Sequence, residues 1–519
     1  MTDLCYNKIV KNCKQNRIML KISNKNEKVI VIGAGIGGLT TGALLAQKGY
    51  DVLILDQAIV PGGCASTFTR KGFIFDVGAT QVAGLEPGGI HYQIFKQLEV
   101  YLPDFMPCDP ACSVYLPGEN IPINIWRDPQ KWQKERLKHF PKSEPFWQLI
   151  KSLFDVSWEF QKRNPILPPG NLWDLWQLIQ ALRPETLITV PYTFYTVGDA
   201  LRKFGLENDV RLRTFLDMQL KLYSQVNAEE TALLYAATAL SVCQSPQGLY
   251  HLQGSMQVLS DRLVEALTKY GGTLLMRHTV EKIITDNNTA KGVYIRNDKT
   301  GEVCLENADH IVANVTVQNL RELLGDKIPF WYRYRIDKLD KPSGAFVIYL
   351  GVDIKAIPEN CPPHLQFLYN YEGEIGENNS LFVSVSKPGD GRAPDGKAVI
   401  IASSFVDTDP WWNSNNYEQL KEEYTKVALS RLAEYFNLTE DTIIHIESAT
   451  PRTFFKYTGR SQGFVGGIGQ RISTFAPFGF GNRTPINKLW LVGDSTHPGE
   501  GTAGVSYSAL TVVNQIEHE

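Results

Sequence analysis

The chain has 519 residues and a formal net charge of −3, with 52 Lys and Arg against 55 Asp and Glu. Its 43% hydrophobic and 21% charged residues are typical of a folded protein and exclude a largely disordered or fibrous chain. Near-neutral charge gives no electrostatic case for a nucleic-acid partner, and eight cysteines are too sparse for a disulfide scaffold. We expect no metal site, because nothing around Cys108 and Cys112 resembles a zinc-ligand set.

The amino-terminal segment is basic. Residues 1–28 hold seven Lys or Arg but lack the apolar core of a signal peptide. We expect residues 1–27 to form a flexible leader, and Met19 is an alternative start to Met1. Apolar runs along the chain are shorter than the roughly 18–20 residues of a membrane-spanning helix, and the longest, residues 231–242, predicts a buried helix.

A dinucleotide-binding pattern begins at residue 28. A β-branched run at residues 28–32 predicts a buried parallel strand, and a helical pattern then continues to Gly49. The turn between them carries the glycines of the motif: Gly33, Gly35, Gly37 and Gly38. Such glycines allow a tight turn, a close approach to a pyrophosphate and close packing of helix on strand. A second strand, residues 51–55, ends on Asp56, which is placed to accept a hydrogen bond from a ribose hydroxyl.

A second glycine pair, Gly62 and Gly63, follows soon after Asp56. In isolation such a pair is typical of a surface turn. In flavoproteins of the amine oxidase and carotenoid desaturase type, however, a glycine pair at this distance from the ribose carboxylate passes close to the flavin. The pair, followed by Phe-Asp-Val-Gly at residues 75–78, therefore favours FAD over NAD.

The middle of the chain is rich in tryptophan, with six of the ten between Trp126 and Trp176. Residues 171–183 predict a helix that carries Leu and Trp on one face and Asp and Gln on the other. Two interpretations stay open: a helix packed on the core, and a helix lying in a membrane interface, which a highly apolar substrate favours. Further on, strand patterns at residues 345–352, 381–385 and 398–403 predict an antiparallel sheet that roofs an apolar tunnel.

The carboxy-terminal segment carries a matching motif. A strand at residues 489–492 leads into Gly493 and Asp494, and a final helix follows from Thr502. This arrangement places a carboxylate and free backbone amides beside a cofactor. Because the two motifs lie at opposite ends of the chain, we expect one FAD-binding domain assembled from both ends.

Together these motifs resemble the phytoene-desaturase type of FAD-dependent carotenoid oxidoreductases over residues 28–519. The segments PGGCAST and GDSTHPGEG are most similar to those of the cyanobacterial C-3′,4′ desaturases of myxoxanthophyll synthesis. The resemblance implies an α/β fold, with a Rossmann-like FAD-binding domain interleaved with an α+β substrate domain. It assigns residues 28–115, 246–315 and 446–519 to the first domain, and residues 116–245 and 316–445 to the second. The implied FAD-binding residues are Gly33, Gly35, Gly37, Gly38, Asp56, Gly62, Gly63, Val280, Gly493, Asp494, Gly501, Thr502 and Val505.

The resemblance implies a desaturase that passes a substrate hydride to the flavin. Its implied partners are a hydrophobic carotenoid, a membrane surface on the cytoplasmic side, and quinone or oxygen as electron acceptor. We assign no catalytic base: His497 is expected to be a hydrogen-bonded loop residue, and Arg452 and Lys456 either support the fold or meet the flavin. Cys64 stands where many flavin oxidases carry arginine, and we expect a small neutral filler there, with a reactive thiol as the alternative.

Three other functions compete with a desaturase. Carotene cis-trans isomerases share the implied fold and cofactor, but tend to have Gly-Asp-Ser-Cys-Phe-Pro-Gly-Gln where this chain has GDSTHPGE. Prenyl-lipid chaperones of the GDP-dissociation-inhibitor type share the architecture but lack an intact flavin site. A soluble amine oxidase needs an aromatic cage around a small amine, and the GDSTHPGEG segment does not suggest an amine oxidase.

Overall fold

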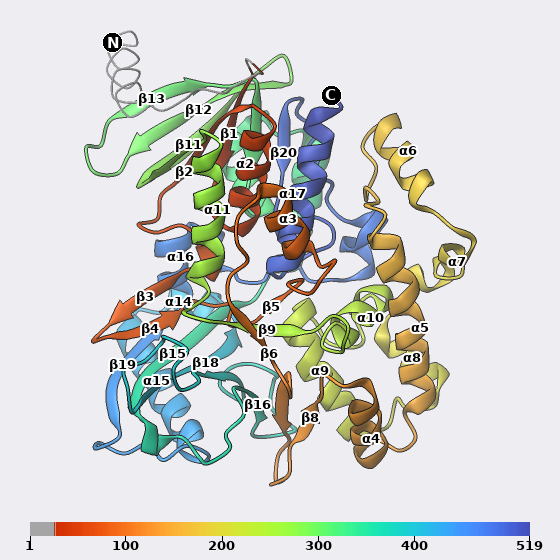
Figure 1. Cartoon of the computed structure of the whole chain (residues 1–519), viewed down its shortest axis with the longest axis vertical. Coiled ribbons are helices and arrows are strands. Elements are labelled where there is room, and N and C mark those ends of the chain that lie inside the picture. Colours follow the sequence, from red (N-terminus) through yellow and green to blue (C-terminus); the bar gives the residue numbers. More distant parts are fainter. Residues whose placement is uncertain (1–24, 26) are drawn as a thin grey trace.

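The computed structural model describes Lys25 and residues 27–519. The expected leader, residues 1–27, therefore lies outside the described residues except for Lys25 and Glu27, as does the alternative start at Met19. Figure 1 shows a parallel sheet and its helices at the top, a second sheet at the lower left and a helical region at the right. Within the described part, none of the helices is long and apolar enough to cross a membrane.

A parallel sheet holds the two ends of the chain together. Its strands run in the order β10-β2-β1-β14-β20, and all neighbouring pairs are parallel. The strands are β1 (Lys28–Ile32), β2 (Asp51–Asp56), β10 (Thr273–Met276), β14 (His310–Ala313) and β20 (Leu489–Leu491). Because β1 is apolar at almost every position, both of its faces can be buried, as a central parallel strand requires.

Each face of this sheet has its own cover. Val29 and Val31 point to one face and belong to the same buried cluster as helices α2, α3, α11 and α17. Ile30 and Ile32 point to the other face, against the antiparallel sheet β11-β12-β13 and helices α12 and α13. This alternation follows from the period of two along a strand. The covering elements are α2 (Ile36–Gln47), α3 (Ile90–Leu98), α11 (Gln257–Lys269), α17 (Thr502–Glu517), β11 (His278–Asp286), β12 (Thr289–Asn297), β13 (Val303–Asn307), α12 (Val317–Leu324) and α13 (Phe330–Asp337).

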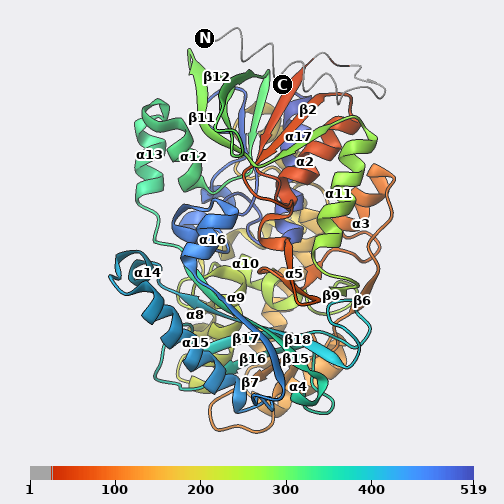
Figure 2. The ribbon, with the colours of Figure 1, turned by 90° about the vertical axis from the view of Figure 1, so that its left-hand side faces the viewer.

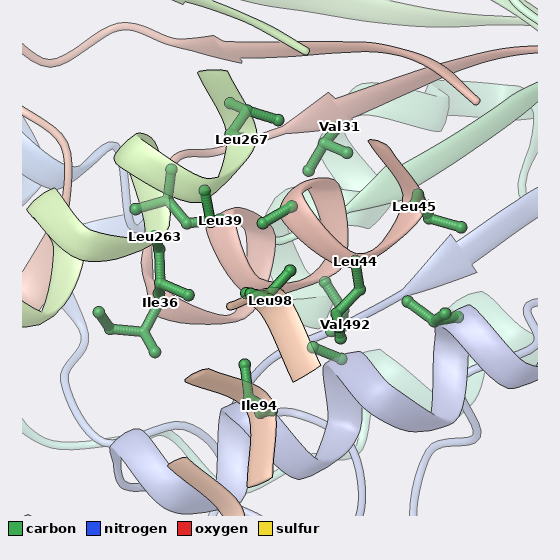
Figure 3. Packing of buried hydrophobic residues seen from close by; sticks show 14 of the residues in the cluster. Val31, Ile36, Leu39, Leu44, Leu45, Ile94, Leu98, Leu263, Leu267 and Val492 are labelled. Carbon is green, nitrogen blue, oxygen red and sulfur yellow. The ribbon is translucent and has the colours of Figure 1, made fainter. Parts of the chain in front are cut away.

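Helix α2 is buried on all sides. Figure 3 shows Leu39 and Ile36 of α2 beside Leu263 of α11, and Leu44 beside Val492, which follows β20. The contacts with α11 and α17 enclose it, and residues 36–46 are all buried. The first glycine-rich motif is therefore fixed on a helix that packs directly against the last segment of the chain.

The second sheet is mainly antiparallel, in the order β19-β15-β18-β17-β16-β7-β8, with a parallel pair between β16 and β7. The predicted strands 345–352, 381–385 and 398–403 correspond to β15, β17 and β18, and their antiparallel pairing is confirmed. The strands are β7 (Cys112–Tyr115), β8 (Ile123–Ile125), β15 (Gly344–Asp353), β16 (His364–Leu368), β17 (Ser380–Val385), β18 (Lys397–Val406) and β19 (Ile443–Ala449). Figure 2 shows α15 lying along this sheet. The adjoining helices are α14 (Asp409–Asn413), α15 (Tyr417–Ala433) and α16 (Pro451–Thr458).

Smaller elements connect the two sheets. A hairpin pairs β3 with β4, and β5, β9 and β6 form a further small sheet. These strands are β3 (Thr67–Arg70), β4 (Phe73–Asp76), β5 (Val82–Ala83), β6 (Phe105–Pro107) and β9 (Leu249–Leu252). The division into an FAD-binding part (28–115, 246–315, 446–519) and a substrate part (116–245, 316–445) stays a proposal. By strand pairing, β7 and β19 join the sheet of the substrate part.

The helical region lies between β8 and β9 along the chain. Its helices are α4 (Pro129–His139), α5 (Glu144–Gln161), α6 (Leu172–Ala181), α7 (Pro184–Leu187), α8 (Val197–Lys203), α9 (Val210–Ser224) and α10 (Leu233–Ser241). The buried helix predicted at residues 231–242 is α10. The helix predicted at residues 171–183 ends earlier, at Ala181, because Arg183 precedes a proline and is extended.

Candidate functional site

The turn after β1 requires glycine at two positions: Gly33, its first residue, and Gly38, where helix α2 packs against the turn. Gly33 has φ +97°, and a Cβ there would lie 2.6 Å from the carbonyl oxygen of Asn314. A Cβ on Gly38 would lie 2.0 Å from the carbonyl oxygen of Gly33. Gly38 therefore lets α2 lie directly on the turn, while Gly35 and Gly37 line the cavity described below.

Asn314 is a site residue that the sequence analysis did not select. It follows β14, and its side-chain nitrogen donates to the carbonyl of Gly33 at 3.2 Å. A Cβ on Gly35 or on Gly37 would meet the Asn314 side chain at 3.0 Å or less. The signal was present in the sequence, because Asn314 follows the strand-like run at residues 310–313, and parallel strands end at one edge of a sheet.

Asp56 lies at the end of β2, next to this turn. Its carboxylate accepts the backbone N–H of Ala34 at 2.7 Å and that of Ala58 at 2.7 Å. Burial raises the pKa of Asp56, and the two N–H donors partly offset that effect. One carboxylate thus stabilises the glycine turn and also borders the cavity.

The second glycine pair lies against the first motif. Gly62 has φ +117° and donates its N–H to the carbonyl of Ala34 at 2.8 Å. Gly63, with φ +58°, is followed by Cys64, whose thiol pKa is raised by burial. A raised pKa leaves the thiol neutral, which agrees with the neutral filler expected at Cys64 rather than with a reactive thiolate.

The carboxy-terminal motif meets the same place. Gly493 has φ +120°, and Asp494 forms a half-buried ion pair with Arg460 at 2.8 Å. Gly501 caps α17, which begins at Thr502. A Cβ on Gly37 would lie 3.4 Å from the carbonyl oxygen of Val505, so the first and last motifs are in contact.

Arg460 is the second site residue that the sequence analysis missed. It comes from the segment after α16, yet its charge acts on the Cys64 thiol. It therefore supplies a cation beside the glycine pair, where the sequence lacks the arginine found in many flavin oxidases. Only tertiary packing brings the two segments together, so no local pattern predicts this contact.

A cavity of about 1520 Å³ joins these elements. It is larger than the roughly 300–1,000 Å³ of a pocket for one drug-sized ligand. All the residues implied by the resemblance line it except Gly38, whose role is packing; they are Gly33, Gly35, Gly37, Asp56, Gly62, Gly63, Val280, Gly493, Asp494, Gly501, Thr502 and Val505. Its far wall is formed by apolar residues of the helical region and the second sheet, among them Leu178, Leu222, Leu234, Phe382 and Phe405.

The three side chains considered for chemistry differ in their surroundings. His497 lies 3.1 Å from the side-chain nitrogen of Gln161, and burial lowers its pKa to about 4, which makes it a weak base. Arg452 donates to the backbone carbonyl of Trp411 at 2.6 Å and so supports α14. Lys456 lines the cavity. The described residues contain no cluster of His, Cys, Asp or Glu suited to a metal ion.

Both the shape of the site and its hydrogen-bonding groups suit a dinucleotide. Gly63 and Gly501 leave room for a close approach, since a Cβ there would meet no neighbouring atom closer than 3.4 Å. The amino ends of α2 and α17 both open on the cavity and present free N–H groups to a pyrophosphate. Asp56, at the end of β2, is the carboxylate that the sequence predicts as the acceptor for a ribose hydroxyl.

Comparisons with known proteins agree with this geometry. The sequence model of the family of flavin containing amine oxidoreductases matches residues 36–516 of this chain. Prolycopene isomerase 1, chloroplastic, of an Oncidium hybrid cultivar is 27% identical, covering 94% of this chain and 83% of the relative. The 1-hydroxycarotenoid 3,4-desaturase of a Flavobacterium species is 25% identical, and the match covers 92% of this chain and 96% of the relative. The structure of cyclohexylamine oxidase from Brevibacterium oxydans is 16% identical, with a TM-score of 0.61, and the match covers 95% of this chain and 100% of that chain. This structural similarity confirms the predicted fold.

Proposed function

The chain belongs to the family of flavin-containing amine oxidoreductases, and we propose that it desaturates a carotenoid. It is an FAD-dependent oxidoreductase of the phytoene-desaturase type. The finer proposal is a C-3′,4′ desaturase, in line with the resemblance of the GDSTHPGEG segment and with a relative named as a 3,4-desaturase. Quinone or oxygen is the proposed electron acceptor.

When bound, FAD supplies the oxidant that takes a hydride from a substrate carbon. The chain's own tasks are to hold the dinucleotide, to orient the substrate and to exclude water. The proposed holding groups are the amino ends of α2 and α17, Asp56 and the Gly62-Gly63 turn. Val280, on β11, borders the same cavity and is the proposed contact of the adenine.

One observation carries the proposal: the cavity that contains the glycine motifs is continuous with an apolar wall in the substrate part. Phe382 and Phe405 come from the second sheet, and Leu178, Leu222 and Leu234 come from the helical region. Such a wall suits a long hydrocarbon. The geometry therefore favours a carotenoid over an amine as substrate.

The test is anaerobic incubation of the FAD-loaded protein with candidate carotenoids in liposomes. We expect the flavin absorbance to bleach while the carotenoid spectrum shifts to the red, because cofactor reduction and longer conjugation are one event. A carotenoid of unchanged mass that reacts only after the flavin has been reduced chemically would contradict the desaturase. Turnover of a small amine without lipid would contradict a carotenoid substrate altogether.

A cis-trans isomerase is the second candidate. The similarity to a prolycopene isomerase over nearly the whole chain favours it. The GDSTHPGE segment, which differs from the Gly-Asp-Ser-Cys-Phe-Pro-Gly-Gln of such isomerases, favours the desaturase. The liposome experiment separates the two, since isomerisation leaves the mass of the carotenoid unchanged.

We further propose that α6, α7 and the 3-10 helix η2 (Val190–Phe194) dock on a membrane surface on the cytoplasmic side. The interpretation of residues 171–183 as a helix packed on the core by its apolar face is wrong, because that face is exposed. Trp176 is 54% exposed, whereas Asp174 on the opposite side is buried and paired with Arg483 at 3.1 Å. The exposed apolar side chains are Leu172, Leu175, Trp176, Ile179, Leu187, Ile188, Val190 and Phe194.

This exposed segment is continuous with the cavity. Val190 and Phe194 are exposed and also line the cavity, together with Leu178 and Leu182. Apolar side chains at a cavity mouth allow an apolar substrate to pass from lipid to the site without crossing water. The docking proposal therefore explains both the inverted helix and the entry of the substrate.

Replacing Trp176 and Ile179 by glutamate is expected to weaken binding to liposomes by about tenfold or more. The two changes remove apolar area worth about 1.5–3 kcal/mol per side chain and add charge at the interface. Co-sedimentation with liposomes measures the effect. The matched control is Val303→Glu on β13, an exposed apolar residue remote in sequence, which should sediment like the parent. Equal binding of the double variant and the parent would contradict docking by α6.

A further inference from the structure

Glu500 is a carboxyl group on the cavity wall to which the proposed function gives no role. It precedes Gly501, the residue that caps α17. Its Oε2 accepts a hydrogen bond from the side-chain nitrogen of Gln225 at 3.1 Å. Its Oε1 is buried and finds no hydrogen-bond partner among Lys25 and residues 27–519. A buried carboxyl oxygen without a partner costs free energy, and at a cavity wall it is open to a partner that the cavity holds.

The groups around Glu500 come from several segments. Asp494 lies on the same turn, Arg460 follows α16, Lys221 belongs to α9 and Tyr235 to α10. Burial raises the pKa of Glu500 well above its ordinary value. The charge of Asp494 raises this pKa further, and Arg460 and Lys221 oppose the rise in part. Tyr235 donates its hydroxyl to a backbone carbonyl and so does not compete for Oε1.

Desaturation needs a proton acceptor that the mechanism above lacks. The candidate base His497 has a lowered pKa and is therefore weak. A carboxylate with a raised pKa is a stronger base, and a catalytic base works best when its pKa lies near the operating pH. Its raised pKa makes the Glu500 carboxylate a stronger base than an exposed carboxylate, and its free oxygen belongs to a side chain that lines the cavity.

We propose that Oε1 of Glu500 accepts the proton that the carotenoid loses during desaturation. This inference rests on the proposed function. One substrate C–H bond gives its hydrogen and both electrons, as hydride, to FAD, which is the oxidant. The neighbouring C–H bond gives its proton to Glu500, and its electron pair becomes the new C=C bond. The carotenoid is thereby oxidised by two electrons, and Glu500 holds the proton until it is released.

The proposal also separates desaturation from isomerisation. Cis-trans isomerisation has no net loss of a proton, so it needs no acceptor of this kind. Glutamine keeps the size and the hydrogen-bonding capacity of the side chain but is not a base. The Glu500→Gln variant should therefore keep its FAD and lose desaturation.

The experiment measures flavin bleaching by carotenoid liposomes under anaerobic conditions, from about pH 6 to about pH 9. In the parent, the rate should rise about tenfold per pH unit below the pKa of Glu500 and level off above it, because only the carboxylate accepts a proton. In Glu500→Gln the rate should fall by about 10²–10⁴-fold and lose this pH dependence. Glu500→Asp should recover part of the rate. The flavin absorbance per protein should be equal in all three.

The matched control is Glu86→Gln. Glu86 is also buried, has an oxygen without a hydrogen-bond partner in the described part of the chain, and has a pKa raised by burial. It lies outside the described residues that line the cavity, so its variant should bleach at the parent's rate.

Two results would overturn the inference alone. The first is a Glu500→Gln rate within about threefold of the parent, since a general base contributes far more than that. The second is loss of bound FAD in both Glu500 variants, which would make Glu500 a support of the cofactor. If no carotenoid bleaches the parent, the proposed function fails and the inference falls with it.

Discussion

Replacing Gly38 by alanine is expected to remove most of the bound FAD, although Gly38 does not line the cavity in the described structure. The new Cβ would lie 2.0 Å from the carbonyl oxygen of Gly33, and a backbone atom cannot rotate away. The clash must shift α2 against the turn and displace the N–H groups at the start of that helix. Forcing a group into a packed contact costs about 1–3 kcal/mol, and each 1.4 kcal/mol that falls on the binding step weakens it tenfold.

The measurement is the ratio of flavin to protein absorbance in the purified variant, together with its thermal unfolding. Gly42→Ala is the matched control, because it lies on the same helix. Its Cβ would lie 2.6 Å from the Cδ1 methyl of Ile54, a side-chain atom that can turn aside. Gly42→Ala should keep its FAD. If Gly38→Ala binds FAD as well as Gly42→Ala does, the contact between Gly38 and Gly33 is not what aligns the cofactor turn.

The parts of the site that the sequence predicts are those that local backbone geometry demands. Gly33, Gly62 and Gly493 have positive φ values that other residues rarely adopt, so glycine marks them in the sequence. Asp56 ends a strand at a fixed distance from the first glycine, and that spacing follows from one βαβ unit. Whether these residues contact FAD is a prediction that loaded protein will test.

The residues that the sequence did not reveal depend on packing between distant segments. Asn314 supports the first turn from another strand, and Arg460 reaches Asp494 from the segment after α16. Neither contact has a pattern within its own segment. Asn314 could be found from the rule that parallel strands end at one edge, whereas Arg460 required the folded structure.

The α6 helix shows a different limit. Its period correctly separates an apolar face from a polar face, but a period alone does not say which face meets the protein. The deciding contact is the pair of Asp174 with Arg483, which lies just before β20. That pair holds Asp174 inside the protein, while Trp176 stays exposed. The apolar surface at the cavity mouth therefore depends on a tertiary contact that the helical period does not contain.

A buried ion pair joins the second sheet to the β3-β4 hairpin. Arg392, in the loop between β17 and β18, contacts Asp76 of β4 at 3.0 Å and Asp390 at 3.4 Å. Asp76 also accepts the backbone N–H of Met256, at the start of α11. Arg392 in turn donates to the carbonyl of Leu252 on β9. The network connects the second sheet to helices and strands of the FAD-binding part.

Arg392→Met is expected to lower the free energy of unfolding by about 3–5 kcal/mol, because it leaves Asp76 and Asp390 buried with less compensation. Arg392 is 3% exposed, so water cannot replace the lost partner. Chemical denaturation of the FAD-loaded protein measures the loss. Lys426→Met is the matched control, since Lys426 pairs with Glu422 but is 72% exposed, and an exposed pair contributes about 0–1 kcal/mol. Equal stability of the two variants would mean that the Arg392 network does not hold the second sheet to the β3-β4 hairpin, and that the apolar contacts between them are sufficient.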